Sequence, residues 1–295
     1  TLLAAMLGEG DLKAWHQGLD SLAPDAHLDW LIKQGFNEKE ALRLKWLSKD
    51  MNKHDLYMTD FMRVFETLER WGPGSEKETR KALSLVPKPP GNILEIGCGK
   101  GLATKVLAEY SQANITAIDN EQSALDRLAQ RFEQQGISNR LETMCASMTE
   151  LPFAKESFDL IWAEGSAYIM GVEKALTAWK PFLRQQGYLM ISDMVWRTDK
   201  PSPESIEFWR QEYPDIQAVQ TRIEQMKKCG YQVVEHFPLS EEAWLNYYGP
   251  LAKRVTECEP EMTSSAALKD IKHEVNICTQ FADEFGYHIF ILAKV

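Results

Sequence analysis

The chain of 295 residues has an ordinary globular composition, with 44% hydrophobic and 26% charged residues, which excludes a disordered, collagen-like or low-complexity protein. Its formal net charge of −10 disfavours nonspecific attraction to nucleic acid or to an anionic membrane. The five cysteines lie far apart without metal-ligand spacing, so we expect reduced thiols, no disulfide framework and no metal site.

The first part of the chain has helical periodicity and no strand-like alternation. We expect residues 1–55 to form an N-terminal helical extension and residues 56–295 to form the main domain. The apolar start is short and lacks the basic region of a signal peptide, and no apolar run reaches the ~18 residues needed to span a bilayer. We therefore expect a cytoplasmic protein. The apolar face of the extension could support a homodimer, although such a face more often covers its own core.

The pattern changes near residue 92 to short apolar strands that alternate with helical segments, which is typical of βαβ units and a parallel sheet. A capping box at Ser75 and Glu78 predicts a helix to about Leu85 just before this region. The expected strands are 92–96, 114–119, 141–145, 158–163, 187–193, 231–237 and 287–293, and the expected helices are 102–110, 121–135, 172–183 and 215–228. Two insertions, about residues 196–214 and 240–286, are expected to cap a cleft at the sheet edge.

The strongest local motif is ILEIGCGKG, a buried strand that begins at Ile93 and runs into a glycine turn. The glycines at Gly97, Gly99 and Gly101 let the backbone turn sharply and approach a ligand that a Cβ atom would push away. Asp119 ends the next expected strand, where an acidic side chain can accept hydrogen bonds from both hydroxyls of a ribose. Together these features predict a cofactor that contains adenosine.

The spacing of the glycines separates two classes of cofactor. A dinucleotide fold expects GxGxxG, but Leu102 stands where the third glycine should lie, and Gly101 makes the pattern GxGxG. Hydride transfer by a nicotinamide dehydrogenase is therefore the weaker interpretation.

At these residues the sequence resembles the class I S-adenosylmethionine-dependent methyltransferases, in particular their small-molecule, ubiquinone/menaquinone-methyltransferase-like branch. The stretch from Glu95 to Gly101 is similar to their first motif, Asp119 to the acidic second one, and LPF at Leu151 with SFD at Ser157 to a further segment. The resemblance covers about residues 72–295. It implies an α/β, Rossmann-like sheet of seven strands, mostly parallel with the last strand antiparallel.

The resemblance also implies the contacts of S-adenosyl-L-methionine, which leaves as S-adenosyl-L-homocysteine. Glu95 would lie near the amino group of the cofactor, and Asp119 would bind its ribose. Ser147 and Met148 would flank the adenine, although Ser147 stands where many members of the family carry Asp. The expected cofactor-binding residues are Glu95, Gly97, Cys98, Gly99, Gly101, Asp119, Asn120, Ser147, Met148 and Glu164.

Glu164 and Tyr168 follow the fourth expected strand and are the candidate catalytic residues. A carboxylate there could orient a nucleophile, take its proton or stabilise positive charge, whereas the alternative is a solvated or helix-capping acid. Sterol- and prenyl-type C-methyltransferases have a similar glutamate, which we take as analogy only. Methyl transfer from a sulfonium mainly needs alignment and a dry site, because the leaving group is already activated, so a dedicated base is optional.

Aromatic residues outside the expected sheet indicate the substrate side of the cleft. Each of them alone more often packs a capping helix, but together they fall in the segments that cover the cleft in this fold. The expected substrate-pocket residues are Tyr57, Tyr168, Trp196, Trp209, Trp244 and Tyr247.

The sequence therefore predicts direct in-line transfer of a methyl group to a small-molecule acceptor. The alternatives are a methyltransferase that acts on RNA or protein and a non-catalytic cofactor-binding module, and the net charge argues against RNA. Neither the acceptor nor the atom that is methylated follows from the sequence.

Overall fold

The computed structural model describes residues 32–33, 53–136 and 138–295. The chain divides into two compact units, Thr1–Phe61 and Met62–Val295. The expected extension over residues 1–55 lies almost wholly outside the described residues. Helix α5 (Lys53–Phe65) begins in the first unit, where the rings of Tyr57 and Phe61 stack with their centroids 6.5 Å apart. None of the helices in the described ranges has both the length and the apolar character that crossing a bilayer requires.

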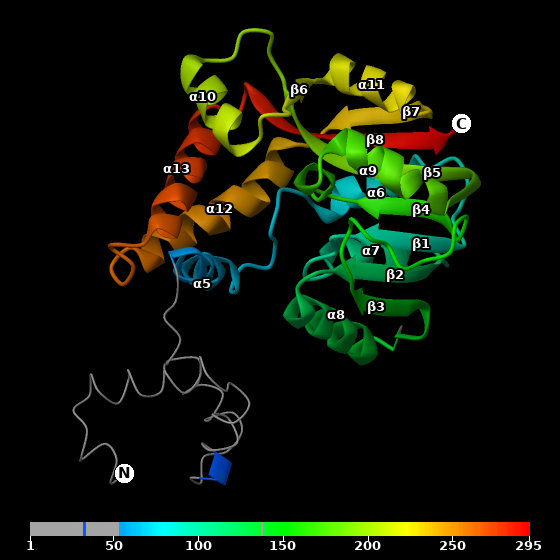
Figure 1. Ribbon diagram of the computed structural model, residues 1–295, viewed down its shortest axis with the longest axis horizontal. Coiled ribbons are helices and arrows are strands. Elements are labelled where there is room, and N and C mark those ends of the chain that lie inside the picture. The colour runs from blue at the N-terminus through cyan, green and yellow to red at the C-terminus, as the bar shows by residue number, and fades with distance from the viewer. Residues whose placement is uncertain (1–31, 34–52, 137) are drawn as a thin grey trace. The chain divides into compact units, whose positions relative to one another are not determined.

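The second unit is built on one mixed sheet. It has eight described strands (Figure 1). Seven of them lie in the order β3-β2-β1-β4-β5-β8-β7, and the eighth, the short β6, pairs with β5. Strand β8 runs antiparallel to β5 and β7, whereas the other pairs are parallel, which confirms the expected fold class. The expected number of seven strands is exceeded by one, because the short β6 was not predicted. The strands are β1 (Asn92–Ile96), β2 (Asn114–Asp119), β3 (Leu141–Cys145), β4 (Phe158–Ala163), β5 (Leu183–Trp196), β6 (Gln217–Ala218), β7 (Tyr231–Pro238) and β8 (Phe285–Lys294).

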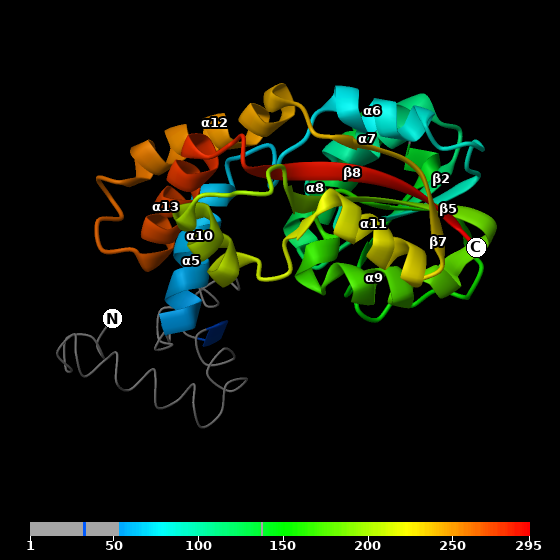
Figure 2. The same ribbon diagram turned by 90° about the horizontal axis from the view of Figure 1, so that it is seen from above.

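Helices cover both faces of this sheet. Helices α6 and α7 lie on one face, and α9 and α11 lie on the opposite face (Figure 2). Ser75 begins α6 as predicted, because its hydroxyl accepts a hydrogen bond from the Glu78 N–H at 3.3 Å. The helices are α6 (Glu76–Ser84), α7 (Leu102–Tyr110), α8 (Gln122–Gln134), α9 (Val172–Trp179) and α11 (Val219–Lys228).

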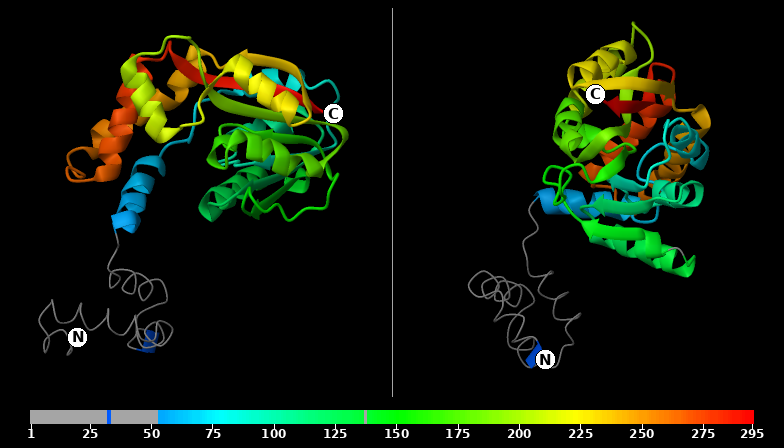
Figure 3. Two further views of the ribbon diagram at one scale, coloured as in Figure 1. Left: turned by 45° about the horizontal axis from the view of Figure 1, so that its top comes forward. Right: turned by 90° about the vertical axis from the view of Figure 1, so that its right-hand side faces the viewer.

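The two expected insertions contain three further helices, α10 (Pro203–Glu212), α12 (Glu241–Cys258) and α13 (Ala266–Gln280). They gather beyond the end of the sheet at which β8 begins (Figure 3). The parallel strands finish at this same end, since Trp196 at the end of β5 pairs with Phe285 at the start of β8. Ligands bind at this end of open α/β sheets, beside the point where the strand order reverses, here between β1 and β4.

Two expected helices differ from the structure at their ends. The helix expected over 172–183 stops at Trp179, because Pro181 follows in a short 3₁₀ turn and Leu183 begins β5. The helix expected over 215–228 begins only at Val219, because the residues before it pair with β5 as β6. The fully buried Arg222 donates a hydrogen bond of 2.6 Å to the Asp215 carbonyl and so holds this segment outside the helix.

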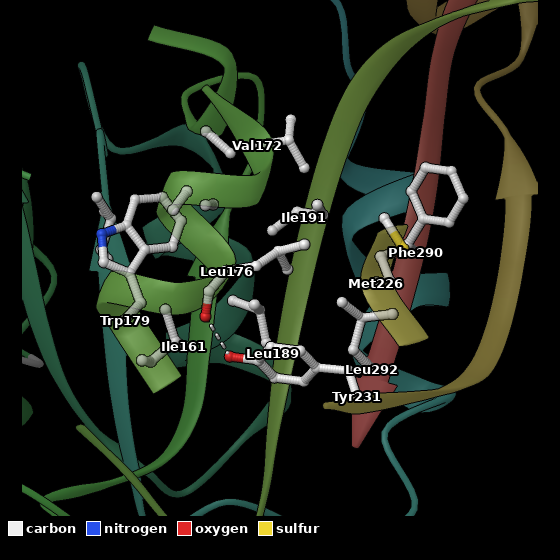
Figure 4. Close-up of a cluster of buried hydrophobic side chains, with 14 of the residues drawn as sticks. Ile161, Val172, Leu176, Trp179, Leu189, Ile191, Met226, Tyr231, Phe290 and Leu292 are labelled. Atoms are coloured by element: carbon white, nitrogen blue, oxygen red, sulfur yellow. Dashed lines mark hydrogen bonds between the residues drawn. The ribbon is translucent and has the colours of Figure 1, made fainter. Parts of the chain in front are cut away.

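Apolar side chains from β4, β5, β8, α9 and α11 form the core between the sheet and the helices α9 and α11 (Figure 4). Leu176 and Trp179 of α9 are fully buried against Leu189 and Ile191 of β5. The Tyr231 hydroxyl at the start of β7 donates a hydrogen bond of 3.0 Å to the Leu176 carbonyl within this cluster. This bond ties the antiparallel edge of the sheet to the helix layer.

Replacing Tyr231 with phenylalanine is expected to lower the free energy of unfolding by about 1 kcal/mol, because the ring stays in place while one buried hydrogen bond is lost. Urea unfolding measures the change. Tyr110→Phe is the matched control, since Tyr110 is 48% exposed. Equal losses in the two variants would show that the buried hydrogen bond contributes nothing.

Candidate active site

A pocket of about 480 Å³ opens at the carboxyl ends of the first four strands. Its walls come from the turn after β1, the ends of β2 and β3, the segment after β4 and the segment that precedes α6. Most of the expected cofactor-binding residues meet here. The expected residues that line it are Glu95, Gly97, Cys98, Gly99, Asp119, Asn120, Ser147, Met148, Glu164 and Tyr168.

The glycine turn after β1 forms the floor of this pocket. Gly97 has a φ of +74°, and a Cβ atom there would lie 2.6 Å from the Ser166 Cβ and 3.0 Å from its Oγ. Ser166 is itself fixed, because its hydroxyl donates a hydrogen bond of 2.6 Å to the Ile96 carbonyl. Position 97 therefore requires glycine, and the bare backbone here faces the pocket.

Gly101 is not among the described residues that line the pocket, although we expected it to contact the cofactor. It caps α7 with a φ of +78°. A Cβ atom there would overlap the Leu128 side chain of α8. Its small size serves the packing of α7 against α8 rather than contact with a ligand.

Asp119 lies beside the glycine turn at the end of β2. Its Oδ2 accepts a hydrogen bond of 2.8 Å from the Gly99 N–H, and its Oδ1 accepts one of 3.0 Å from the Glu121 N–H. These bonds fix the orientation of the carboxylate. Each oxygen keeps further acceptor capacity, as binding the two hydroxyls of a ribose would require.

Glu95 is a buried carboxyl group in the pocket wall, with only 3% of its surface exposed. Its Oε2 has no hydrogen-bond partner in the part of the chain that the structure describes. Burial and, to a smaller extent, the negative charges of Glu164 and Asp119 raise the pKa of Glu95 to about 8. An unpartnered buried acceptor of this kind fits a ligand that brings its own donor, such as an amino group.

The raised pKa of Glu95 makes the stability of the free protein depend on pH. The folded state holds the proton up to about pH 8, whereas the unfolded carboxyl releases it near its usual pKa of 4.5, so the contribution to stability falls as the pH rises between these values. Urea unfolding between pH 5 and pH 8.5 is expected to show wild type losing stability relative to Glu95→Gln. Parallel curves for the two proteins would contradict the raised pKa.

Glu164 follows β4, is half-buried and also lines the pocket. The Thr79 hydroxyl of α6 donates a hydrogen bond of 2.7 Å to its Oε1. Burial raises the pKa of Glu164, although the hydrogen bond from Thr79 and the positive charge of Arg70 act in the other direction. This carboxyl group is held by specific neighbours and is not a solvated surface acid.

Arg70 and Thr79 are site residues that we did not predict. Lys100 of the glycine turn donates hydrogen bonds to the Glu66 carbonyl at 2.6 Å and to the Leu68 carbonyl, which fixes the segment that carries Arg70. Burial lowers the pKa of Arg70, while the nearby carboxylates of Glu164 and Glu78 oppose this change. The only signal in the sequence for Arg70 and Thr79 was their position just before and after the Gly72–Gly74 turn. This position does not show where their side chains point.

On the adenine side of the expected site, Ser147 lines the pocket and is exposed. Its hydroxyl pairs with the Thr149 hydroxyl at 2.8 Å and accepts a hydrogen bond of 3.2 Å from the Thr149 N–H. Met148 lies next to it, and its carbonyl accepts a hydrogen bond of 2.9 Å from the buried Trp179 indole. Burial raises the pKa of the Cys98 thiol, so this cysteine is a packing residue in the turn and not a nucleophile.

The expected substrate-pocket residues separate in the structure. Tyr168 lines the pocket, whereas Trp196, Trp209 and Trp244 are absent from the described lining and pack around Phe285 with ring centroids 5.0–6.2 Å apart. These three tryptophans thus serve the packing of the helices beyond the sheet. Tyr247 lines a neighbouring pocket of about 390 Å³, and Tyr57 lies in the first unit.

The chain is similar to known methyltransferases. Residues 93–187 match a family model described as a methyltransferase domain. Cycloartenol-C-24-methyltransferase 1 of Oryza sativa subsp. japonica is 24% identical over 73% of this chain and 68% of that protein, and an O-methyltransferase of Pyrenophora dematioidea is 26% identical over 62% and 74%. A solved methyltransferase from Geobacter sulfurreducens in complex with S-adenosyl-L-homocysteine superposes with a TM-score of 0.68 at 17% identity, over 80% of this chain and 97% of that one.

These likenesses and the fold define the class of the protein. It carries a methyltransferase domain with the class I architecture. The chain is an S-adenosylmethionine-dependent methyltransferase, and the bare backbone at Gly97, the anchored Asp119 and the unpartnered Glu95 oxygen fit that cofactor.

Proposed function

We propose that this methyltransferase acts on a small-molecule acceptor that binds between the cofactor and the side chains of Glu164 and Tyr168. The observation that carries the proposal is one pocket lined by the glycine turn, by Asp119 and by the half-buried Glu164 carboxyl group. The names of the relatives, a cycloartenol C-24-methyltransferase and an O-methyltransferase, support a small acceptor, but they differ in the atom that receives the methyl group.

Each part of the cofactor has residues suited to it. The backbone at Gly97 would lie against the cofactor, Asp119 would accept hydrogen bonds from the ribose hydroxyls, and the free Glu95 oxygen would accept one from the amino group. Arg70 would pair with the carboxylate, and Ser147 with Met148 would flank the adenine. When bound, the cofactor supplies a methyl group on a sulfonium, which is a good leaving group.

The acceptor side requires alignment and the exclusion of water. Glu164 would orient the attacking atom or take its proton, and its raised pKa makes it a stronger base than an ordinary carboxylate. The Tyr168 ring, which is 40% exposed, would cover the acceptor at the mouth of the pocket. Alignment at about 3–3.5 Å can contribute on the order of 7–11 kcal/mol to the barrier reduction.

Several finer predictions stand beside this proposal. The ubiquinone/menaquinone-methyltransferase-like branch, a cytoplasmic location and a homodimer remain predictions from the sequence. The same is true of capping by the two insertions.

The acceptor class can be tested with S-adenosylmethionine that carries tritium in its methyl group. We expect the protein to transfer the label to components of a low-molecular-mass metabolite extract and not to purified RNA or protein fractions. The control is the same extract with the Glu164→Gln variant. Label found only in the RNA or protein fraction would overturn the small-molecule proposal.

A further inference from the structure

Thr79, in the first turns of α6, contacts the Glu164 carboxyl group from a buried position, since only 1% of its surface is exposed. Its hydroxyl oxygen lies 2.7 Å from the Glu164 Oε1 and 3.1 Å from the Ser75 carbonyl oxygen. A hydroxyl group carries a single proton, whereas a carboxylate and a carbonyl group only accept hydrogen bonds. The Thr79 hydroxyl can therefore donate fully to only one of these two oxygens at a time.

The charge of Glu164 decides which oxygen receives the Thr79 proton. When Glu164 is ionised, its carboxylate is the stronger acceptor, and 2.7 Å is at the upper end of the range for a charge-assisted hydrogen bond from a hydroxyl. The Ser75 carbonyl keeps a partner in this state, because it also accepts the Thr79 N–H at 3.1 Å. When Glu164 holds a proton, its own O–H can donate to the Thr79 oxygen, and the Thr79 proton turns to the Ser75 carbonyl. Each of the three groups thus has a partner in both states.

Thr256 of α12 shows the same helix contact without a carboxylate. Its hydroxyl donates a hydrogen bond of 3.1 Å to the carbonyl of Ala252, four residues earlier, as threonines in helices commonly do. Thr256 is exposed, and among the described residues its hydroxyl has no second acceptor. The hydrogen bond from Thr79 to Glu164 is therefore additional to the common contact, and it joins α6 to the segment that follows β4.

Several neighbours set the pKa of Glu164. Burial raises this pKa, and the hydrogen bond from Thr79 lowers it. The positive charge of Arg70 also lowers the pKa of Glu164, whereas the negative charge of Glu78 raises it. The charge of Glu164 in turn acts on the pKa of Glu95. Because Thr79 is uncharged, replacing it removes one hydrogen bond and leaves all these charges in place.

We infer that Thr79 is a positioning residue for methyl transfer, whose hydroxyl holds Glu164 at the pocket and favours the ionised carboxylate that takes a proton from the acceptor. The inference rests on the proposed function, in which Glu164 is the base. In the transfer step a lone pair of the acceptor forms a bond to the methyl carbon, and the carbon–sulfur bond breaks with its electron pair on sulfur. The proton of the acceptor goes to Glu164, while Thr79 keeps its own proton and turns it to the Ser75 carbonyl.

The first test needs no acceptor. Thr79→Val keeps the shape of the side chain but removes the hydroxyl, and it is made in wild type and in Glu164→Gln. Urea unfolding then compares the four proteins from pH 4.5 to pH 8.5. A carboxyl group whose pKa is raised by folding loses stability as the pH rises, and removing the hydrogen bond from Thr79 raises the pKa of Glu164 further. In the wild-type background we expect Thr79→Val to reduce the folding equilibrium constant about tenfold more at pH 8.5 than at pH 4.5, and in Glu164→Gln equally at both.

The second test measures transfer of tritium from S-adenosylmethionine to the low-molecular-mass extract across pH. In Thr79→Val the rise of the rate should move to higher pH, so that the rate on the acidic side falls about tenfold while the rates at high pH converge. Thr79→Ser keeps the hydroxyl and should restore the wild-type profile. Thr256→Val is the matched control, because it removes a hydroxyl with the same helix contact, and it should leave the profile unchanged.

A destabilisation by Thr79→Val that does not depend on pH in the wild-type background would overturn the inference. The same is true if Thr79→Ser shifts the rate profile as far as Thr79→Val does, since the hydroxyl would then have no part in the effect. If wild type transfers no label to the extract, the proposed function is contradicted, and the unfolding comparison still decides whether Thr79 favours the ionised form of Glu164.

Discussion

A valine at position 97 is expected to weaken binding of S-adenosylmethionine by about a hundredfold. Its Cβ atom would lie 2.6 Å from the Ser166 Cβ, and its backbone would have to keep a φ of +74°. Overpacking and left-handed strain cost roughly 1–3 kcal/mol each, so we expect the turn to adopt a different backbone conformation that no longer fits the cofactor. Calorimetric titration with S-adenosylmethionine measures the loss.

Gly72→Ala is the control for this variant. Gly72 also lines the pocket, but a Cβ atom there would meet nothing within 4 Å. Its affinity for S-adenosylmethionine should stay close to that of wild type. If Gly97→Val bound the cofactor as well as Gly72→Ala does, the inference that the backbone at Gly97 lies against the cofactor would be wrong.

Removing the charge of Glu164 is expected to slow methyl transfer by about 10²–10⁴-fold, the usual effect of losing a general base. Glu164→Gln keeps the shape of the side chain and an acceptor for the Thr79 hydroxyl. Because burial raises the pKa of Glu164 above 4.5, the wild-type rate should rise with pH as this carboxyl ionises, and this rise should be absent from the variant. Single-turnover rates across pH provide the measurement.

The matched control is Glu150→Gln, which changes an exposed glutamate after β3 and should keep the wild-type rate. Affinity for S-adenosylmethionine should change little in Glu164→Gln, since Asp119 and the glycine turn are untouched. A Glu164→Gln enzyme with an undiminished rate and an unchanged pH profile would show that this carboxylate only supports the structure.

The parts of the fold that follow from local sequence were predicted closely. Strands β1 to β4 begin and end where we expected, because each is a short apolar run bounded by turn residues. The capping box at Ser75 predicted the start of α6, and the GxGxG pattern with Asp119 predicted the pocket floor. These signals depend on neighbours in the chain, which is why one sequence suffices to find them.

The remaining parts of the site depend on contacts between distant segments. Thr79 reaches Glu164 across 85 positions of the chain, and Ser166 reaches Ile96 across 70. From the sequence, the tryptophans at 196, 209 and 244 could equally have lined the cleft. In the structure all three pack against the ring of Phe285 instead. The short strand β6 likewise depends on Arg222, whose burial no local pattern indicates.

The most direct test of the account is a calorimetric titration of S-adenosyl-L-homocysteine into wild type and Asp119→Ala. We predict binding of one molecule per chain to wild type and a loss of at least about tenfold in the variant, because charge-assisted hydrogen bonds to the ribose are removed. Thermal unfolding of both proteins verifies that the variant is folded. No binding to wild type, or equal affinity in a folded variant, would contradict the proposal that the glycine turn and Asp119 hold the cofactor.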